Sequence, residues 1–404
     1  MSLSLFKYYF LLCVLNSLDI ELLILKCPFN WRTKFIYEKR HLIVGAGLYG
    51  AVTAYLAKQS GLKCLIIDKR NHIGGNVYSE NKEGIEVHKY GPHIFHTNSK
   101  LIWKFASQFT DFNHFRYNPL ARYKNNLYHL PFNMNTFHEI FGVETPNEAR
   151  EAIHTDQRRE FYTNPANLEE QAISLIGRTL YDLLVKGYTE KQWGKKATEL
   201  PTSIIKRIPL RFTYDNNYFN DIYQGIPMYG YTKWVTNMLN NVEIKFGVDF
   251  LKSPNFWLNI AHKIIYCGSI DEFFEYELGE LEYRSLRFEE TLLENPDYQG
   301  CIAINETSIH VPYTRTIEHK HFMFGQQPIT IITKEYPTKW EHGMEKYYPV
   351  NNERNNLLYK KYKQLAFHRY PNVSFVGRLG CYQYLNMDEV IGMAINNFNR
   401  EILN

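Results

Sequence analysis

The stretch that decides the fold is Val44-Gly45-Ala46-Gly47-Leu48-Tyr49-Gly50. The apolar residues 41–44 before it predict a β-strand, and residues 51–59 after it are rich in helix formers. A second apolar run, residues 64–67, ends in Asp68. Strand, Gly-x-Gly-x-x-Gly, helix, strand and acidic residue is the order found in dinucleotide-binding units, so we expect one here.

Each glycine of this motif has a separate physical role. Gly45 permits the tight turn, Gly47 lets the backbone approach a pyrophosphate, and Gly50 lets the helix pack closely on the strand. The unpaired N–H groups at the helix N-terminus then face the phosphates. Asp68 follows Gly50 by 18 residues and can accept hydrogen bonds from ribose hydroxyls. A glycine-rich turn without a ligand is the alternative, and the surrounding pattern favours the dinucleotide.

Composition narrows the class of protein. A chain of 404 residues is long enough for two or three domains, and a net charge of +4 gives no reason to expect nucleic acid as a partner. Aromatic residues make up 16% of the chain, with 31 tyrosines, which suits a packed core or a site that stacks bases and binds sugars. Six cysteines without a Cys-x-x-Cys pair indicate reduced thiols and a cytoplasmic protein.

Residues 1–40 precede the first predicted strand. Their apolar run, residues 5–15, is shorter than a membrane span, and no small-residue cleavage site follows it. We therefore expect an N-terminal extension, with a misassigned start as an alternative origin, and no stable membrane insertion.

Two further motifs follow the second strand. Lys69-Arg70-Asn71-His72-Ile73-Gly74-Gly75-Asn76 predicts a second loop that wraps the cofactor, against the alternative of an ordinary Gly-Gly turn. His93 and His96 have a spacing that could hold a metal, but no third ligand is near in the sequence, so we expect no metal site.

Many ordered motifs resemble those of one enzyme family, the bacterial type of UDP-galactopyranose mutase. The resemblance runs from residue 41 to the C-terminus. Besides the glycine motifs, the stretches that carry it are residues 90–97 (YGPHIFHT), 130–137 (LPFNMNTF), 186–194 (KGYTEKQWG), 204–209 (IIKRIP), 217–219 (NYF), 223–227 (YQGIP), 311–315 (VPYTR), 333–337 (TKEYP), 347–350 (YYPV) and 377–379 (GRL).

The resemblance implies an isomerase that interconverts UDP-galactopyranose and UDP-galactofuranose without net redox change. Its cofactor would be FAD, active when reduced, with N5 of the flavin forming an adduct with galactose. It also implies a cytoplasmic homodimer with UDP-galactose as substrate and a role in cell-wall and surface polysaccharide biosynthesis.

The expected fold is α/β: a discontinuous Rossmann-like FAD-binding domain, an inserted helical domain and a mainly antiparallel sheet domain. Helices are predicted over residues 148–153 and 168–185, and strands over 242–246, 263–268, 310–315, 330–334 and 373–376. The expected domain ranges are 1–40 (extension), 41–115, 241–290 and 371–404 (FAD-binding domain), 116–145, 206–240 and 291–370 (sheet and substrate domain), and 146–205 (helical domain, with a mobile lid near 199–211).

The resemblance also assigns site residues. In the family the tyrosine at 188 stacks on uracil, the tryptophan at 193 lines the sugar pocket, and two arginines hold the diphosphate. The implied catalytic residues are His93, Arg207, Arg315, Tyr384 and Asn386. The implied cofactor-binding residues are Gly45, Gly47, Leu48, Gly50, Asp68, Lys69, Arg70, Gly75, Asn76, His93, Ile94, Val248, Asp249, Phe250, Arg378 and Met387. The implied substrate-binding residues are Leu184, Tyr188, Trp193, Arg207, Tyr218, Arg315, Glu335, Tyr348, Arg378, Tyr384 and Asn386.

Four positions depart from the family pattern. Leu184 stands where relatives often have Phe, Tyr117 where they have Asn beside the sugar, and Cys381 where an acidic residue is common. Asn386 replaces an Asp close to the sugar and flavin; its simplest role is a helix N-cap, which Asn fills about as well as Asp. Because Asn lacks the charge that would offset a cationic intermediate, we expect lower turnover than in typical relatives.

Two alternative functions stay open at this point. An FAD-dependent oxidoreductase of the amine-oxidase class shares the fingerprint and the Gly-Gly loop, although the later motifs argue against it. A catalytically impaired nucleotide-sugar-binding homologue would keep the binding residues and lack turnover.

Overall fold

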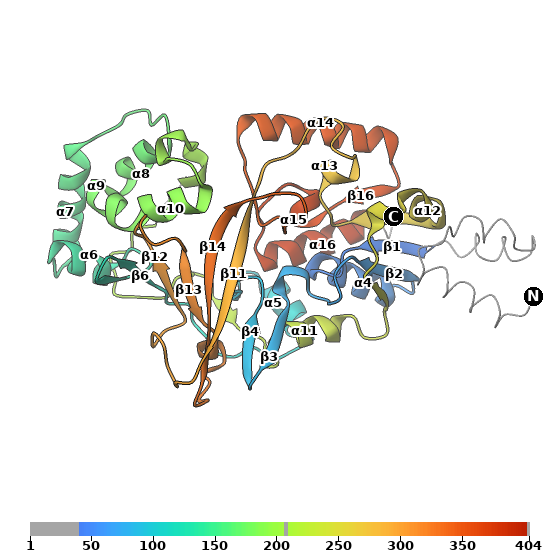
Figure 1. Cartoon of the computed structure of the whole chain (residues 1–404), viewed down its shortest axis with the longest axis horizontal. Helices are drawn as coiled ribbons and strands as arrows, with labels where there is room; N and C mark the ends of the chain where they lie inside the picture. The colour runs from blue at the N-terminus through green and yellow to red at the C-terminus, as the bar shows by residue number, and fades with distance from the viewer. Residues whose placement is uncertain (1–39, 206–208, 402–404) are drawn as a thin grey trace, which may run out of the picture.

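The computed structural model describes residues 40–205 and 209–401 (Figure 1). The described chain contains a parallel sheet, a larger and mainly antiparallel sheet, and a helical unit, which confirms the predicted α/β class with a Rossmann-like domain, an antiparallel sheet domain and an inserted helical domain. No helix in the described ranges is both long and apolar enough to cross a lipid bilayer.

The parallel sheet has the strand order β16-β10-β1-β2-β9, and every neighbouring pair in it is parallel. Both faces of such a sheet must be covered by other elements. Leu42 and Ile43 of β1 accordingly point into two different core clusters, one on each face. The strands are β1 (Arg40–Val44), β2 (Cys64–Asp68), β9 (Glu243–Phe246), β10 (Ala261–Tyr266) and β16 (Val373–Phe375).

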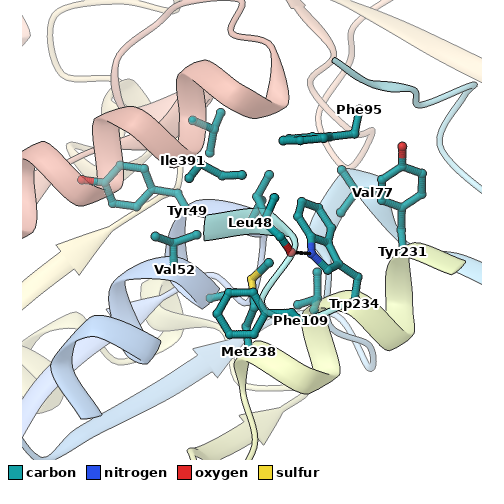
Figure 2. Packing of buried hydrophobic residues seen from close by; sticks show 14 of the residues in the cluster. Leu48, Tyr49, Val52, Val77, Phe95, Phe109, Tyr231, Trp234, Met238 and Ile391 are labelled. Carbon is teal, nitrogen blue, oxygen red and sulfur yellow. Dashed lines mark hydrogen bonds between the residues drawn. The ribbon is translucent and has the colours of Figure 1, made fainter. Parts of the chain in front are cut away.

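One face is covered by helices that pack around Trp234 (Figure 2). The Trp234 ring is fully buried, and its indole N–H donates to the backbone carbonyl of Ala106 over 3.0 Å. This bond satisfies a polar group that burial would otherwise leave unpaired. The helices that contribute to this cluster are α4 (Leu48–Gln59), α5 (Lys100–Ala106), α11 (Gly230–Met238) and α16 (Met387–Glu401).

The opposite face is covered by later segments of the chain. Phe250, Trp257 and Tyr362 are among the large side chains buried there. The helices on this side are α12 (Pro254–Ile260), α13 (Ile270–Phe273) and α14 (Glu353–Arg369), and the short α15 (Gly377–Gly380) follows β16.

The turn between β1 and α4 explains two of the motif's glycines. Gly45 has φ +113°, a conformation that residues with a side chain rarely adopt. A Cβ at Gly50 would lie 2.1 Å from the carbonyl oxygen of Gly45, so only glycine fits there. The helix begins at Leu48, three residues before the predicted start, because the glycine turn itself supplies its first turn.

The second sheet has seven strands in the order β15-β11-β14-β13-β12-β6-β7, antiparallel except for the pair β12–β6. Two small ribbons, β3–β4 and β5–β8, lie outside both sheets. These strands are β3 (Ser79–Lys82), β4 (Ile85–His88), β5 (Phe95–Thr97), β6 (Leu120–Tyr123), β7 (Asn126–His129), β8 (Tyr223–Gly225), β11 (Tyr283–Leu293), β12 (Ala303–Glu306), β13 (Arg315–Glu318), β14 (Thr330–Lys339) and β15 (Tyr348–Pro349).

The predicted strand over 310–315 is wrong for most of its length. Only Arg315 belongs to a strand, β13, and the residues before it form a loop. The Lys191 ammonium donates to the carbonyls of Val311 and Tyr313 over 3.0 and 2.8 Å, which holds those carbonyls away from a sheet ladder.

The helical unit has its own core, built around Leu168, Ile173 and Tyr181. The single helix predicted over 168–185 is broken at Gly177, which has φ +82°. A Cβ there would lie 2.4 Å from Oδ2 of Asp156, and this carboxylate oxygen accepts the Thr179 N–H over 2.7 Å. The unit comprises α6 (Met134–Phe141), α7 (Pro146–Arg159), α8 (Leu168–Ile176), α9 (Arg178–Leu180), a π-helical turn (Tyr181–Val185) and α10 (Lys186–Trp193).

Candidate active site

One cavity of about 820 Å³ receives side chains from all three units. Its floor includes the glycine turn after β1, and its walls include residues of the helical unit and of β12 and β13. A single space therefore joins the dinucleotide motif to the residues that the sequence assigned to substrate.

The glycine loops form a cradle that is open at Gly47. A Cβ at Gly47 would meet no chain atom closer than 3.8 Å, the Cα of Gly75. Gly47 has φ −72°, which any residue adopts, so neither packing nor backbone strain within the chain requires glycine there. The position is nevertheless on the cavity surface, beside the N-terminus of α4. Glycine at this position leaves space that belongs to the cavity alone. A bound dinucleotide would fill that space.

Asp68 joins the two glycine loops. Its carboxylate accepts the Ala46 N–H over 2.7 Å and the Arg70 N–H over 2.8 Å. Each carboxylate oxygen can still accept a further hydrogen bond, and Asp68 lies on the cavity wall. The expected contact with ribose hydroxyls is therefore sterically open.

Arg70 reaches across this end of the cavity. Its guanidinium forms an ion pair with Glu345, donates to the Asn76 side chain over 3.0 Å, and lies 4.7 Å from the centre of the Tyr90 ring. Burial acts to raise the pKa of Glu345, but the Arg70 guanidinium outweighs it and holds that pKa below its ordinary value. This end offers fixed charges to a polar cofactor.

His93 lies where the cofactor end meets the centre of the cavity. Its Nδ1 is 2.8 Å from the Gly91 carbonyl, and its backbone N–H donates to Nδ1 of His88 over 3.2 Å. Burial, with a smaller contribution from the Arg378 charge, lowers the pKa of His93 to about 4. The ring is neutral at physiological pH and presents an uncharged surface to the cavity.

Arg315 is the buried positive charge at the other end. Its Nε lies 3.3 Å from a carboxylate oxygen of Glu335, and one terminal N–H donates to the Tyr188 hydroxyl over 3.1 Å. Burial acts to lower the pKa of Arg315, but the Glu335 carboxylate reverses this and raises it, so the guanidinium is charged. The remaining N–H groups of the fork can bind phosphate oxygens.

Five tyrosines cluster about Arg315. Tyr117 and Tyr218 meet edge to face with ring centres 5.4 Å apart, and Tyr348 stacks on Tyr384 at 5.7 Å. Burial raises the pKa of Tyr117, Tyr218 and Tyr348, so all three hydroxyls stay protonated. The protonated phenols of Tyr117 and Tyr218, which line the cavity, can donate to phosphate or sugar oxygens.

The cavity brings together most of the assigned residues. All sixteen assigned to the cofactor line it. Of the substrate set, Trp193, Glu335 and Tyr348 lie outside its lining: Trp193 packs against the helical core, and Glu335 lies behind Arg315. Arg207 is outside the described residues. Those that do line the cavity are Leu184, Tyr188, Tyr218, Arg315, Arg378, Tyr384 and Asn386.

Asn386 does not act as a side-chain cap of α16. Its backbone N–H donates to a carboxylate oxygen of Glu389 over 2.7 Å, but the Glu389 N–H goes to Asp388 instead of the Asn386 side chain. In the described part of the chain no hydrogen bond holds the Asn386 amide, which lies on the cavity wall. Asn386 therefore stands at the N-cap position, where its carbonyl accepts the Val390 N–H over 3.0 Å, but its amide makes no capping bond among the described residues and can contact a ligand.

Two residues were missed by sequence reasoning. Oδ1 of Asn305 is buried without a partner among the described residues, and Asn305 lines the cavity, so it can accept from a ligand. Lys191 donates to three carbonyls of the 306–313 loop and so positions Arg315 relative to Tyr188 on the same helix. Burial lowers the pKa of Lys191 to about 8. Neither role has a local sequence signal, since both depend on residues far apart in the chain.

Two family profiles and several known proteins match this chain. A family profile described as UDP-galactopyranose mutase matches residues 183–384, and one described as an NAD(P)-binding Rossmann-like domain matches 43–109. A dTDP-fucopyranose mutase of Escherichia coli is 39% identical over 88% of this chain and 96% of its own length. A probable UDP-galactopyranose mutase of Klebsiella pneumoniae is also 39% identical, over 89% and 93%.

More distant relatives agree. A UDP-galactopyranose mutase of Mycoplasma genitalium is 32% identical over 88% of this chain and 92% of its own. Among solved structures, a reduced UDP-galactopyranose mutase has a TM-score of 0.68 at 15% identity, covering 91% of this chain and 96% of its own. A putrescine oxidase variant has a TM-score of 0.55 at 8% identity, covering 91% and 99%. These two structures establish a shared fold.

Replacing Gly47 tests the cofactor end. We expect Gly47→Val to abolish FAD binding, because the new side chain would fill the space above the cradle, while the apoprotein keeps its stability. The measurements are flavin absorbance of the purified protein and urea unfolding of the apoprotein. A Gly47→Val protein that retains flavin would contradict the placement.

Gly50→Ala is the matched control. Its Cβ would collide with the Gly45 carbonyl rather than enter the cavity, so the apoprotein should lose about 1–3 kcal/mol of unfolding free energy. Equal urea midpoints for the two variants would show that the glycines do not divide their roles in this way.

Proposed function

This chain belongs to the UDP-galactopyranose mutase family, and from that premise we propose that it interconverts the pyranose and furanose forms of a nucleotide-linked galactose with bound FAD. The observation that carries the proposal is the single cavity, which joins an open glycine cradle to a buried arginine and its tyrosines. An enzyme in which cofactor and sugar nucleotide must meet requires such a joint space.

The residues present fit FAD. The open position at Gly47, the N-terminus of α4 and the oxygens of Asp68 would hold its pyrophosphate and ribose. Reduced FAD, when bound, supplies a nucleophile for the anomeric carbon, so the isomerisation needs no net redox change. The neutral His93 ring and Arg378 would lie along the flavin, and the N-terminus of α16 would favour negative charge near it.

The other residues act on the sugar nucleotide. Arg315 would hold the diphosphate and stabilise the charge that develops when it leaves the sugar. Tyr188, fixed by its bond to Arg315, would stack on the base with Leu184 beside it. Arg207, on the expected lid, would close on the same diphosphate. Burial of this arrangement keeps water from the opened sugar.

The substrate has a second candidate. The relative named dTDP-fucopyranose mutase is as similar to this chain as the one named probable UDP-galactopyranose mutase, so overall identity does not separate the two nucleotide sugars. The amine-oxidase alternative has weaker support, because the putrescine oxidase likeness is one of fold at 8% identity. We further propose a cytoplasmic homodimer that supplies furanose sugars for surface polysaccharides, since sugar nucleotides of this kind are cytoplasmic metabolites.

Turnover by the purified protein tests the function. After reduction with dithionite, the protein should convert UDP-galactofuranose or its 6-deoxy counterpart to the pyranose, and after reoxidation it should not. Chromatography of the sugar nucleotides measures this. A reduced, flavin-loaded protein that binds but converts neither would instead be the impaired binding homologue.

Removing Arg315 tests the diphosphate site. Arg315→Ala should weaken UDP binding by about 1.5–3 kcal/mol, the usual contribution of a charged hydrogen bond, with flavin content unchanged. Calorimetric titration of the oxidised protein with UDP measures it. Arg315→Lys keeps a charge beside Glu335 but loses the fork, so we expect an intermediate loss.

Arg287→Ala is the control, because Arg287 is 60% exposed and stacks on Tyr336 away from the cavity. Its UDP affinity should match the parent. Parent-like affinity in Arg315→Ala would remove Arg315 from the site.

Restoring a carboxylate at 386 tests the effect of Asn386. Asn386→Asp should raise kcat, because a negative charge beside the sugar would offset positive charge on the reacting carbon, and FAD content should not change. Steady-state kinetics of the reduced protein measure it. An unchanged kcat would mean that the amide already serves the reaction fully.

A further inference from the structure

We propose that the sugar end of the cavity selects a 6-deoxyhexose over galactose, and that Tyr117 is the residue that sets this preference. The inference rests on the proposed function and specifies its substrate. Galactose and its 6-deoxy form, fucose, differ only in whether C6 carries a hydroxyl, so the question is which group the cavity wall accepts.

The part of the wall concerned is aromatic. We call Tyr117, Tyr218 and Phe219 the aromatic wall. The Tyr117 ring lies nearly parallel to Phe219 with centres 5.9 Å apart and at an angle of 26°, and all three residues line the cavity. Phe219 in turn stacks on His96 at 3.7 Å. The faces of these rings therefore form a continuous aromatic surface in the cavity, joined to β5 through His96.

This wall is held rigidly. The Tyr218 N–H donates to the Tyr117 carbonyl over 2.7 Å, which ties the two segments together. His96, which stacks on Phe219 and also lines the cavity, is bonded to Asp221 over 2.8 Å. Tyr117 is only 5% exposed, so its ring has little room to rotate away from a ligand.

The ring faces of the wall offer no hydrogen-bond partner for an extra sugar hydroxyl. The carboxylates that line the described cavity are Asp68, Asp249, Glu272 and Glu345, all at the cofactor end. Glu335, the carboxylate nearest to Arg315, lies behind it as its ion-pair partner. Near Arg315 the cavity's polar groups are amides and hydroxyls, and none belongs to the ring faces of the aromatic wall. They are those of Asn305, Asn386, Tyr188 and Tyr384, with the Tyr117 and Tyr218 hydroxyls at the ring edges.

The physical preference follows from this. A methyl group against an aromatic surface gains apolar contact, whereas a hydroxyl there would lose its water without a matching partner. The reacting atoms of the sugar, C1, O4 and O5, must stay accessible to one another, and C6 takes no part in the ring exchange. We therefore assign the C6 group to the aromatic wall.

The Tyr117 hydroxyl gives the proposal a sharp test. No hydrogen bond joins this hydroxyl to a residue that the structure describes. If it were a partner for a C6 hydroxyl, galactose would be favoured, and removing it would shift the preference toward the deoxy sugar. If instead the ring acts as an apolar wall, removing the hydroxyl should leave the sugar preference unchanged. Only removing the ring should change it.

The experiment compares UDP-galactopyranose with UDP-6-deoxygalactopyranose, which share the nucleotide. The full chain loaded with FAD is reduced with dithionite, and kcat/KM is measured for each sugar by chromatography. Calorimetric titration of the oxidised protein with each compound gives the dissociation constants without turnover. We expect the parent to favour the 6-deoxy sugar at least about tenfold in both measurements, the range that one group in an apolar pocket supplies.

Three variants locate the effect. Tyr117→Phe should keep the preference, and Tyr117→Asn should shift it toward galactose by at least about tenfold, with flavin content as the check on folding. Tyr229→Asn, at a tyrosine that is 74% exposed, should leave the ratio unchanged. Should Tyr117→Asn fail to fold, the parent and Tyr117→Phe ratios still decide.

A parent that favours galactose, or shows no preference, would overturn the inference and leave the proposed function intact. A Tyr117→Phe variant shifted further toward the 6-deoxy sugar would also overturn it, by assigning the hydroxyl to C6. Loss of turnover on both sugars would refute the proposed function, and the binding ratio would still judge the inference.

Discussion

The contact between Gly50 and the carbonyl of Gly45 is the constraint on which the rest of the site depends. With no side chain at Gly50, α4 can begin against the end of β1, where a Cβ would lie 2.1 Å from that carbonyl. The helix N-terminus then faces the cavity, and Asp68 can bridge to the Ala46 N–H. If a side chain at position 50 displaced α4, the helix N-terminus would no longer face the cavity and Asp68 would lose its bond to the Ala46 N–H.

The other end of the cavity depends on a buried charge. A guanidinium removed from water is stable only with a partner, and Arg315 has the Glu335 carboxylate behind it. Because Glu335 lies on the Nε side, the terminal N–H groups of the guanidinium that do not bind Tyr188 remain for a ligand. The protonated Tyr117 and Tyr218 beside it supply donors without adding charge, so a diphosphate would meet a positive centre with polar, uncharged neighbours.

Contacts between the helical unit and the seven-stranded sheet hold the two ends of the cavity in position. Lys191 lies on α10 with Tyr188, and it binds the loop that leads into Arg315 on β13. The bond between Tyr188 and Arg315 closes the same link. The helical unit thereby contributes side chains to the cavity that the glycine turn after β1 also lines.

The sequence by itself determined the features that depend on short spacing. The strand, glycine turn, helix and acidic residue between 41 and 68 follow from local sterics, and the cofactor residues assigned within this stretch line the cavity. Ordered motifs likewise identified the family. Features that depend on distant partners were decided only in the tertiary structure. Gly177 breaks a helix because Asp156 occupies the space beside it, and residues 310–314 leave the sheet because Lys191 binds their carbonyls. The Glu389 N–H, which a capping side chain at Asn386 would bind, donates to Asp388 instead, so the Asn386 amide is left to line the cavity. Such outcomes depend on competition between groups far apart in the chain, or between several local partners, which residue spacing alone does not encode.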